Sequence, residues 1–179
     1  MSAIRCLVLD VDGVLTDGGL YTDDSGLQMR RFHVHDGFAI SWFQKLGGVV
    51  VICSGKDSPA VAARARELGI QHVIQASRDK LADLHALLTH LGVTLEEVAM
   101  IGDDLPDLPV MRSCGFPIAV ANAVAEVRAA ARLVTRRGGG QGAVREAIEH
   151  LLRTSGQWAE VLAHYGVPAE QRAGSERHS

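Results

Sequence analysis

The sequence predicts a single α/β domain in which helices cover both faces of a parallel β-sheet. Short apolar runs recur along the 179 residues, and segments with helical spacing of their apolar positions separate most of them. The runs lack strict polar–apolar alternation, which is typical of parallel strands buried on both faces. We therefore expect a Rossmann-like doubly wound parallel sheet with a small β-hairpin insertion and no large cap domain.

The first half of the chain supplies three of the expected strands, at residues 4–9, 49–53 and 71–74. Residues 20–22 and 27–32 flank the polar turn Asp23-Asp24-Ser25-Gly26, which predicts a hairpin. Helical spacing over residues 37–46 ends at a glycine pair. A second helix begins at Ser58-Pro59, because proline suits the first helical turn, and it runs to residue 68.

The second half repeats this alternation. An amphipathic helix over residues 79–91 is closed by a glycine, and apolar runs at 98–101, 117–120 and 133–134 predict strands. The remaining helices are expected at residues 105–112, 124–131, 143–153 and 158–164. We expect residues 1–166 to form one domain, with the hairpin at about 20–32, and residues 167–179 to form a mobile tail.

Composition and charge exclude several classes of protein. Apolar residues make up 47% of the chain and charged residues 22%, as in folded globular domains. No apolar run reaches the ~18 residues of a membrane span, and a carboxylate at residue 10 comes too early for a signal peptide. A net charge of −3 and 4% aromatic residues disfavour nucleic-acid binding. Three cysteines without metal-motif spacing, Cys6, Cys53 and Cys114, indicate a reduced cytoplasmic protein.

Acidic residues gather where strands end. Asp10 and Asp12 follow the first strand, and Asp103, Asp104 and Asp107 follow the fourth. The carboxyl ends of parallel strands meet at one edge of a sheet, so we expect these side chains to lie close together. Two carboxylates ~4 Å apart repel by about 4 kcal/mol at an effective dielectric near 20, and a divalent cation removes that repulsion. Oxygen ligands without thiolates point to Mg²⁺, whereas an isolated aspartate would be a loop former or helix cap.

A candidate phosphate site lies beside these carboxylates. Ser54 and Gly55 stand between a strand and a helix N-terminus, where backbone N–H groups bind anions. Lys80 follows the third strand and adds a positive charge suited to phosphate. The alternatives are a helix cap for Ser54 and a solvated surface position for Lys80.

The segment Asp10-Val11-Asp12-Gly13-Val14-Leu15-Thr16 resembles the first motif of the haloacid dehalogenase-like phosphohydrolases. Ser54, Lys80 and Gly102-Asp103-Asp104 with Asp107 follow in the order of that family's other motifs, and the resemblance spans residues 4–152. It implies an aspartyl-phosphate mechanism in which Asp10 is the nucleophile and Asp12 the general acid and base.

The same resemblance implies a role for each remaining motif residue. Asp10, the backbone carbonyl of Asp12 and Asp103 would bind Mg²⁺, while Asp104 and Asp107 would act through water or by anchoring the other ligands. Ser54, the Gly55 amide and Lys80 would hold the phosphoryl oxygens.

The hairpin, the segment Phe32–Gly37 and the sequences GDDLPDLPVM and RRGGGQGAVRE are similar to the capless branch that contains the 3-deoxy-D-manno-octulosonate 8-phosphate (KDO 8-phosphate) phosphatases. This implies a sugar-acid phosphate substrate, with KDO 8-phosphate first and KDN 9-phosphate or another nonulosonate phosphate as the alternative. It also implies a homotetramer in which the hairpin packs against its copies. The substrate contacts implied are His33, Val34, His35, Asp36, Gly37, Lys56 and Arg64. Lys56 and Ser41 stand where that branch has arginine, although Lys56 and Arg64 can still face a carboxylate.

Other interpretations compete with this one. One interpretation places His33 and His35 on one face of a strand, where they would chelate a metal, and the other has them line the substrate mouth. Cys53 suggests a cysteine phosphatase, but Pro59 stands where the arginine of such a loop would fall. The glycine run 138–142 is not a P-loop, because no Gly-Lys-Ser/Thr follows; it would let the backbone approach a substrate or a neighbour's tail, or form a flexible turn.

Two further functional classes remain in view. The first is a phosphoacceptor regulatory domain, and the aspartates at the first strand argue against it. The second is a catalytically silent assembly module, and the complete set of site residues argues against that.

Overall fold

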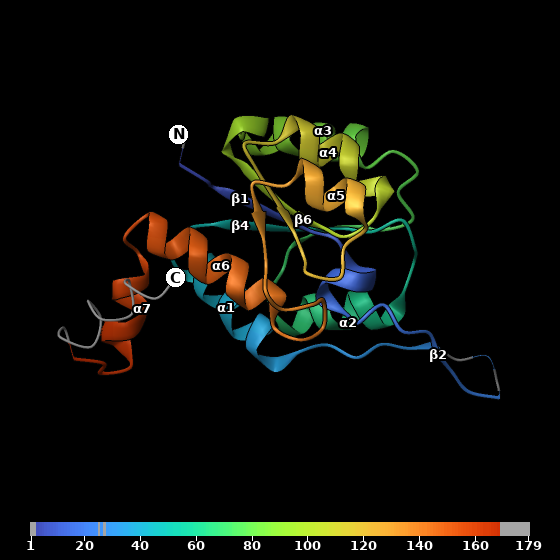
Figure 1. The fold of residues 1–179 in the computed structure, drawn as a ribbon, viewed down its shortest axis with the longest axis horizontal. Helices are drawn as coiled ribbons and strands as arrows, with labels where there is room; N and C mark the ends of the chain where they lie inside the picture. Colours follow the sequence, from blue (N-terminus) through green and yellow to red (C-terminus); the bar gives the residue numbers. More distant parts are fainter. Residues whose placement is uncertain (1–2, 25, 27, 169–179) are drawn as a thin grey trace.

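A six-stranded parallel sheet forms the centre of the molecule (Figure 1). The computed structural model describes residues 3–24, 26 and 28–168. The strands lie in the order β5-β4-β1-β6-β7-β8, so β1 is central and the chain winds outward in both directions. Their bounds are β1 Cys6–Leu9, β4 Val49–Cys53, β5 His72–Ile74, β6 Val98–Gly102, β7 Phe116–Ala119 and β8 Leu133–Val134. This is a doubly wound Rossmann-like order, which confirms the predicted fold class.

The central strands are buried along their whole length. Every residue of β1 and β6 is buried, and Cys6 at the start of β1 lies opposite Val49 on one side and Val98 on the other. Burying one valine, leucine or isoleucine side chain contributes about 1.5–3 kcal/mol. The apolar runs that predict the strands therefore also form the core.

Helices cover both faces of the sheet (Figure 1). One face carries α3 (Lys80–Leu91), α4 (Leu108–Ser113) and α5 (Ala125–Ala130). The other carries α1 (Val34–Lys45), α2 (Pro59–Glu67) and α6 (Ala143–Thr154), with α1 packed against α6. A final helix, α7 (Trp158–His164), packs against α6.

Local sequence decides where the helices begin. The Asp79 side chain accepts a hydrogen bond from the Ala82 amide at 3.0 Å and caps α3.

The single helix predicted over residues 105–112 is instead a 3₁₀ turn, η3 (Leu105–Asp107), followed by α4. Prolines at positions 106 and 109 explain the break, because they lack the N–H group that a continuous helix needs. A second 3₁₀ turn, η2 (Leu95–Glu97), precedes β6.

Helix α1 begins three residues before its predicted start. The Nδ1 atom of His33 accepts a hydrogen bond from the His35 amide at 3.3 Å and caps the helix. The strand geometry considered for His33 and His35 is therefore wrong. Their rings instead meet edge to face at a helix N-terminus, with centroids 5.1 Å apart.

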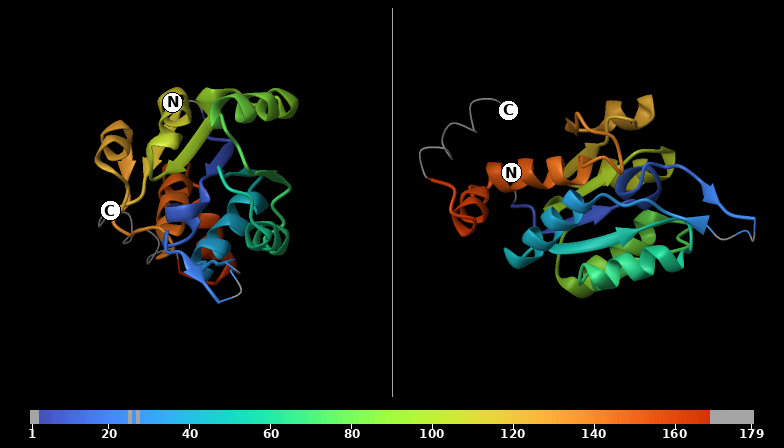
Figure 2. Two further views of the ribbon diagram at one scale, coloured as in Figure 1. Left: turned by 90° about the vertical axis from the view of Figure 1, so that its right-hand side faces the viewer. Right: turned by 90° about the horizontal axis from the view of Figure 1, so that it is seen from below.

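The hairpin projects from the body of the molecule (Figure 2). It consists of β2 (Tyr21–Thr22) and β3 (Gln28–Met29), and a bridge between Thr16 and Phe32 closes its base. The paired segments are shorter than predicted. Ser25 and Leu27 lie outside the described residues.

Helix α7 is held by aromatic contacts. The Trp42 Nε1 atom donates to the Tyr165 hydroxyl at 3.2 Å, and the ring centroids of Phe38 and Tyr165 are 5.6 Å apart. Of the predicted tail at 167–179, residues 169–179 lie outside the described part of the chain. No helix among the described residues has the length and apolar character to cross a membrane.

Candidate active site

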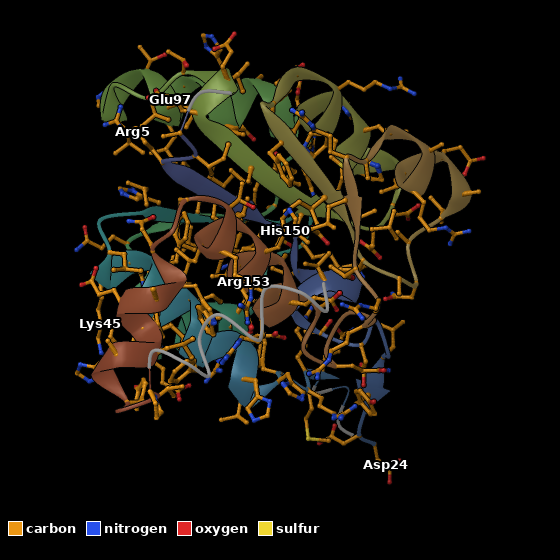
Figure 3. All side chains as sticks on the ribbon, turned by 60° about the vertical axis from the view of Figure 1, so that its left-hand side comes forward. Arg5, Asp24, Lys45, Glu97, His150 and Arg153 are labelled. Carbon is orange, nitrogen blue, oxygen red and sulfur yellow. The ribbon has the colours of Figure 1, made fainter. Side chains whose placement is uncertain are left out.

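The strand ends bring the predicted site residues to one edge of the sheet. Asp10 follows β1, Ser54 follows β4, and Asp103 follows β6; these three strands pair side by side. The Asp10 amide donates to the Ile101 carbonyl at 3.1 Å, which ties the end of β1 to β6. The opposite edge carries the Arg5–Glu97 ion pair, which Figure 3 places far from Asp24 at the hairpin tip.

Lys80 joins two buried carboxylates at this edge. Its Nζ atom lies 2.5 Å from Asp10 Oδ1 and 2.7 Å from Asp107 Oδ1. None of the three residues is more than 7% exposed. Burial lowers the pKa of Lys80, but the attraction of Asp10 and Asp107 outweighs burial and raises that pKa above its usual value. Burial and the charge of Asp107 raise the pKa of Asp10 to about 6, although Lys80 opposes them.

Asp103 completes an acidic cluster with these two carboxylates. One oxygen from each of Asp10, Asp103 and Asp107 lies within 4.8 Å of the others. Burial, and then the charges of Asp10 and Asp107, raise the pKa of Asp103 to about 7. Such crowding favours a cation that prefers oxygen ligands, because the cation would offset the repulsion.

Asp107 anchors the loop that follows β6. Its Oδ1 atom is engaged by Lys80, and its Oδ2 atom accepts hydrogen bonds from the amides of Asp103 at 3.0 Å and Asp104 at 3.4 Å. Asp104 is exposed, and its carboxylate accepts from the Leu105 amide at 2.8 Å. Both side chains therefore hold the backbone that carries Asp103, and their supporting role in metal binding stays a prediction.

A tight turn, η1 (Val11–Leu15), follows Asp10 and carries Asp12. Gly13 has φ +96°, and a Cβ there would lie 2.0 Å from Asp103 Oδ2, so the position requires glycine. The Thr16 hydroxyl closes the turn: it donates to the Val11 carbonyl at 3.2 Å and accepts from the Gly13 amide at 3.3 Å. This packing places the turn directly against Asp103.

The glycine run 138–142 packs on the same turn. The Gly140 amide donates to the Val14 carbonyl at 3.1 Å. Asn122 links the two segments, since its Oδ1 atom accepts from the Gly139 amide at 2.7 Å and its Nδ2 atom donates to the Gly13 carbonyl at 3.3 Å. The glycines thus let the backbone approach this chain's own turn. Nothing in the local sequence around Asn122 indicates this bridge.

The Asp12 carboxylate lies outside the acidic cluster, among cations. Arg30 Nε donates to its Oδ1 atom at 3.0 Å, and Lys56 Nζ lies 3.6 Å from its Oδ2 atom. Arg30 also donates from Nη1 to the Ser58 hydroxyl at 2.7 Å. Sequence reasoning missed Arg30, because it lies in the hairpin and belongs to no recognised motif.

Ser54 and Gly55 form the turn between β4 and α2. Ser54 is 3% exposed, its amide donates to the Ile74 carbonyl at 2.9 Å, and its hydroxyl accepts from the Lys56 amide at 3.2 Å. Gly55 is exposed, and the nearest atom to a Cβ there would be 3.6 Å away. The turn lies at the same edge of the sheet as Asp10. Phosphate binding by Ser54, Gly55 and Lys80 stays a prediction.

The predicted substrate contacts of α1 differ in accessibility. Val34 is 74% exposed and His35 is also exposed, whereas Asp36 is only 2% exposed. Asp36 Oδ1 accepts from the Arg145 amide at 2.7 Å, and its buried Oδ2 atom has no hydrogen-bond partner within the part of the chain described. Burial raises the pKa of Asp36 to about 6.

Arg64 packs against the start of α1. A Cβ at the buried Gly37 would lie 2.4 Å from Arg64 Nη2. Arg64 Nη1 is 2.8 Å from Glu67 Oε2, while the Lys56 side chain is 58% exposed. Ser41 lies further along α1 and is half-buried. Gly37, Arg64 and Lys56 remain predicted substrate contacts.

Cys53 does not have the environment of a catalytic thiolate. It is fully buried at the end of β4, and burial raises its pKa to about 12. A thiol with that pKa stays protonated near neutral pH and is a poor nucleophile. This argues against the cysteine-phosphatase interpretation.

Comparison with known proteins gives consistent results. A family model described as haloacid dehalogenase-like hydrolase matches residues 69–148. The 3-deoxy-D-manno-octulosonate 8-phosphate phosphatase of Escherichia coli K12 is 41% identical over 157 residues, which cover 88% of this chain and 84% of the relative. The phosphatase of the same name from Yersinia pestis is 42% identical over 149 residues, covering 83% and 80%.

Solved structures agree with the sequence relatives. A 3-deoxy-D-manno-octulosonate 8-phosphate phosphatase from Moraxella catarrhalis, in complex with a magnesium ion, a phosphate ion and KDO, superposes with a TM-score of 0.89 at 39% identity. The match covers 91% of this chain and 94% of that one. The cobalt-bound phosphatase from Haemophilus influenzae has a TM-score of 0.83 at 39% identity, covering 86% and 90%.

Proposed function

The chain belongs to the haloacid dehalogenase-like hydrolases, and on this basis we propose that it is a phosphatase that hydrolyses KDO 8-phosphate to KDO and inorganic phosphate. The observation that carries the chemistry is the buried Asp10–Lys80–Asp107 group beside Asp103, at the carboxyl ends of adjacent strands. The substrate rests on the two relatives named for it and on the KDO molecule bound in the Moraxella structure.

The acidic cluster fits a magnesium ion. Its donors are carboxylate oxygens, which Mg²⁺ prefers, and their closeness leaves repulsion for a cation to offset. Asp10, Asp103 and the carbonyl of Asp12 would hold the ion. Both oxygens of Asp107 are already engaged, so we assign Asp107 to anchoring, together with Asp104. The bound ion would supply positive charge to the phosphoryl oxygens.

The reaction proceeds in two steps. In the first, an oxygen of Asp10 attacks phosphorus, the bond from phosphorus to the sugar oxygen breaks, and Asp12 gives its proton to that oxygen. In the second, water attacks the phosphoryl group, Asp12 takes the proton, and the bond between phosphorus and Asp10 breaks. The products are the sugar acid and inorganic phosphate, and Asp10 and Asp12 return to their starting states.

Residues around the acidic cluster bind the rest of the substrate in this proposal. Ser54, the Gly55 amide and Lys80 hold phosphoryl oxygens. His33, Val34, His35, Asp36, Gly37, Lys56 and Arg64 form the sugar-acid side, where the exposed Lys56 faces the substrate carboxylate. KDN 9-phosphate and other nonulosonate phosphates remain the alternative substrates, because Lys56 is a point charge and does not hold a carboxylate through two hydrogen bonds.

Assembly and location complete the proposal. The hairpin exposes Leu20, Tyr21 and Met29 at 71%, 42% and 58%, an apolar surface that supports packing against copies in a homotetramer. Three free cysteines are compatible with a reducing cytoplasm. We assign residues 1–166 to one hydrolase domain, and residues 169–179 of the expected tail lie outside the described part of the chain.

The test is phosphate release in the presence of Mg²⁺ from KDO 8-phosphate, KDN 9-phosphate and ordinary hexose phosphates. A preference for KDO 8-phosphate supports the proposal, and a preference for KDN 9-phosphate moves the assignment within the branch. Asp10→Asn serves as the control and should abolish turnover while the protein stays folded. No release from any of these compounds by folded, Mg²⁺-loaded protein would overturn the phosphatase assignment.

A further inference from the structure

Arg30 is a buried cation at the base of the hairpin with no assigned role. Its side chain is only 7% exposed. Its Nε atom donates to Asp12 Oδ1 at 3.0 Å, and its Nη1 atom donates to the Ser58 hydroxyl at 2.7 Å. One guanidinium therefore binds the candidate proton-transfer group and a fixed point on the body of the protein.

Both ends of this link are themselves held in place. Ser58 is 2% exposed, stands at the start of α2, and its amide donates to Gln75 Oε1 at 2.9 Å. The Thr16–Phe32 bridge fixes the backbone two residues after Arg30. A guanidinium is planar and its donors point in fixed directions, so two hydrogen bonds define where the Asp12 carboxylate lies.

We propose that Arg30 is a positioning residue that holds the Asp12 carboxylate outside the acidic cluster of Asp10, Asp103 and Asp107, in place for proton transfer. This inference rests on the proposed function, in which Asp12 gives and then takes a proton. Lys56 cannot substitute for Arg30, because its side chain is 58% exposed and its single charged atom is 3.6 Å from Asp12.

The two chemical steps depend on Asp12 differently when the leaving group changes. A sugar alkoxide needs a proton as its bond to phosphorus breaks. The p-nitrophenolate ion is stable in neutral water and leaves from p-nitrophenyl phosphate without one. Hydrolysis of the aspartyl-phosphate needs Asp12 with either substrate, because water must lose a proton as it attacks. A misplaced Asp12 therefore slows both steps for a sugar phosphate but only the second for p-nitrophenyl phosphate.

The experiment compares wild type, Arg30→Met and Arg30→Lys by rapid mixing with p-nitrophenyl phosphate and Mg²⁺, and by steady-state kinetics on KDO 8-phosphate. Arg31→Met is the matched control, because Arg31 is 60% exposed and pairs with Asp17 at 3.3 Å. Arg30→Met should release a burst of p-nitrophenolate at the wild-type rate, and its size should approach one molecule per active site. The steady-state turnover that follows should be about 10- to 100-fold slower than that of the wild type. The kcat of Arg30→Met on KDO 8-phosphate should fall at least as far, with little change in KM. Arg30→Lys should have intermediate kinetics, and Arg31→Met should match the wild type.

Other outcomes overturn the inference. Equal slowing of burst and turnover would assign Arg30 a general structural role, and a raised KM with unchanged kcat would assign it to substrate binding. If Arg30→Lys behaves like the wild type, two directed hydrogen bonds are not needed to position Asp12. Arg30→Lys also carries the test if Arg30→Met does not fold. If the wild type is active and Arg30→Met shows the same kinetics as the wild type, the inference about Arg30 is refuted and the proposed function stands. A folded wild type without activity on either substrate overturns the proposed function and this inference with it.

Discussion

Gly139→Ala tests how the turn η1, which carries Asp12, is held in place. A Cβ at this position would lie 1.7 Å from the Gly13 carbonyl oxygen and 2.8 Å from the Thr16 carbonyl oxygen. Both are backbone atoms of the segment that carries Asp12. Real Cβ contacts do not fall below 3.0 Å, so the turn or the glycine loop must move by about 1.3 Å, the difference between 3.0 and 1.7 Å. We expect kcat to fall about 100-fold, because misplacement of reacting groups by about 1 Å costs that much.

The same substitution should lower the free energy of unfolding by about 1–3 kcal/mol, so a control must separate stability from activity. Gly156→Ala provides it. Gly156 follows α6 at φ +77°, and a Cβ there would meet nothing within 4 Å, so alanine strains the backbone far from the turn at a cost of about 1–2 kcal/mol. Phosphate release and urea unfolding are measured for both variants. Wild-type kcat in Gly139→Ala, or an equal loss of kcat in Gly156→Ala, would refute the reasoning.

Three further predictions concern charged residues of the candidate site. Burial raises the Asp36 pKa from 3.8 to about 6, so ionisation of Asp36 lowers stability as pH rises through that interval, by about 3 kcal/mol in total. The unfolding free energy of Asp36→Asn relative to wild type should therefore rise from pH 4 to about pH 6 and then level off; a pH-independent difference in urea unfolding contradicts this. Lys80→Met removes the cation between two buried carboxylates and should lower the free energy of unfolding by about 3–5 kcal/mol in EDTA. Part of that loss should return with Mg²⁺, and equal losses in both buffers would argue against a metal site. Mg²⁺ should raise the melting temperature of the wild type but not of Asp103→Asn; an equal rise in both would exclude Asp103 as a ligand.

Much of the fold was predictable because its signals are local. The apolar runs that mark β1, β4 and β6 are also the buried strands, and the caps and glycines that bound α3 lie next to it in sequence. The acidic cluster was predictable for a topological reason, since residues at the ends of neighbouring parallel strands must meet.

The remaining features depend on contacts between distant segments. Arg30 meets Asp12 across 18 residues, and Asn122 meets Gly13 across 109. No periodicity or short motif encodes such pairs, because each depends on how loops pack after the sheet has formed. The early start of α1 was missed for a different reason: a histidine cap at position 33 is less recognisable than serine or aspartate.

The packing of the glycine run 138–142 on the turn η1 has a consequence for synthesis of the chain. Every acidic residue of the site has been made once residue 107 is added, but the supports of the turn arrive later, with Asn122 and then Gly139 and Gly140. A growing chain therefore carries all its reactive groups for some time without the geometry to use them. We expect phosphatase activity to arise only after residue 140 has left the ribosome. A message that stops before codon 139 would yield a protein with complete motifs and no turnover.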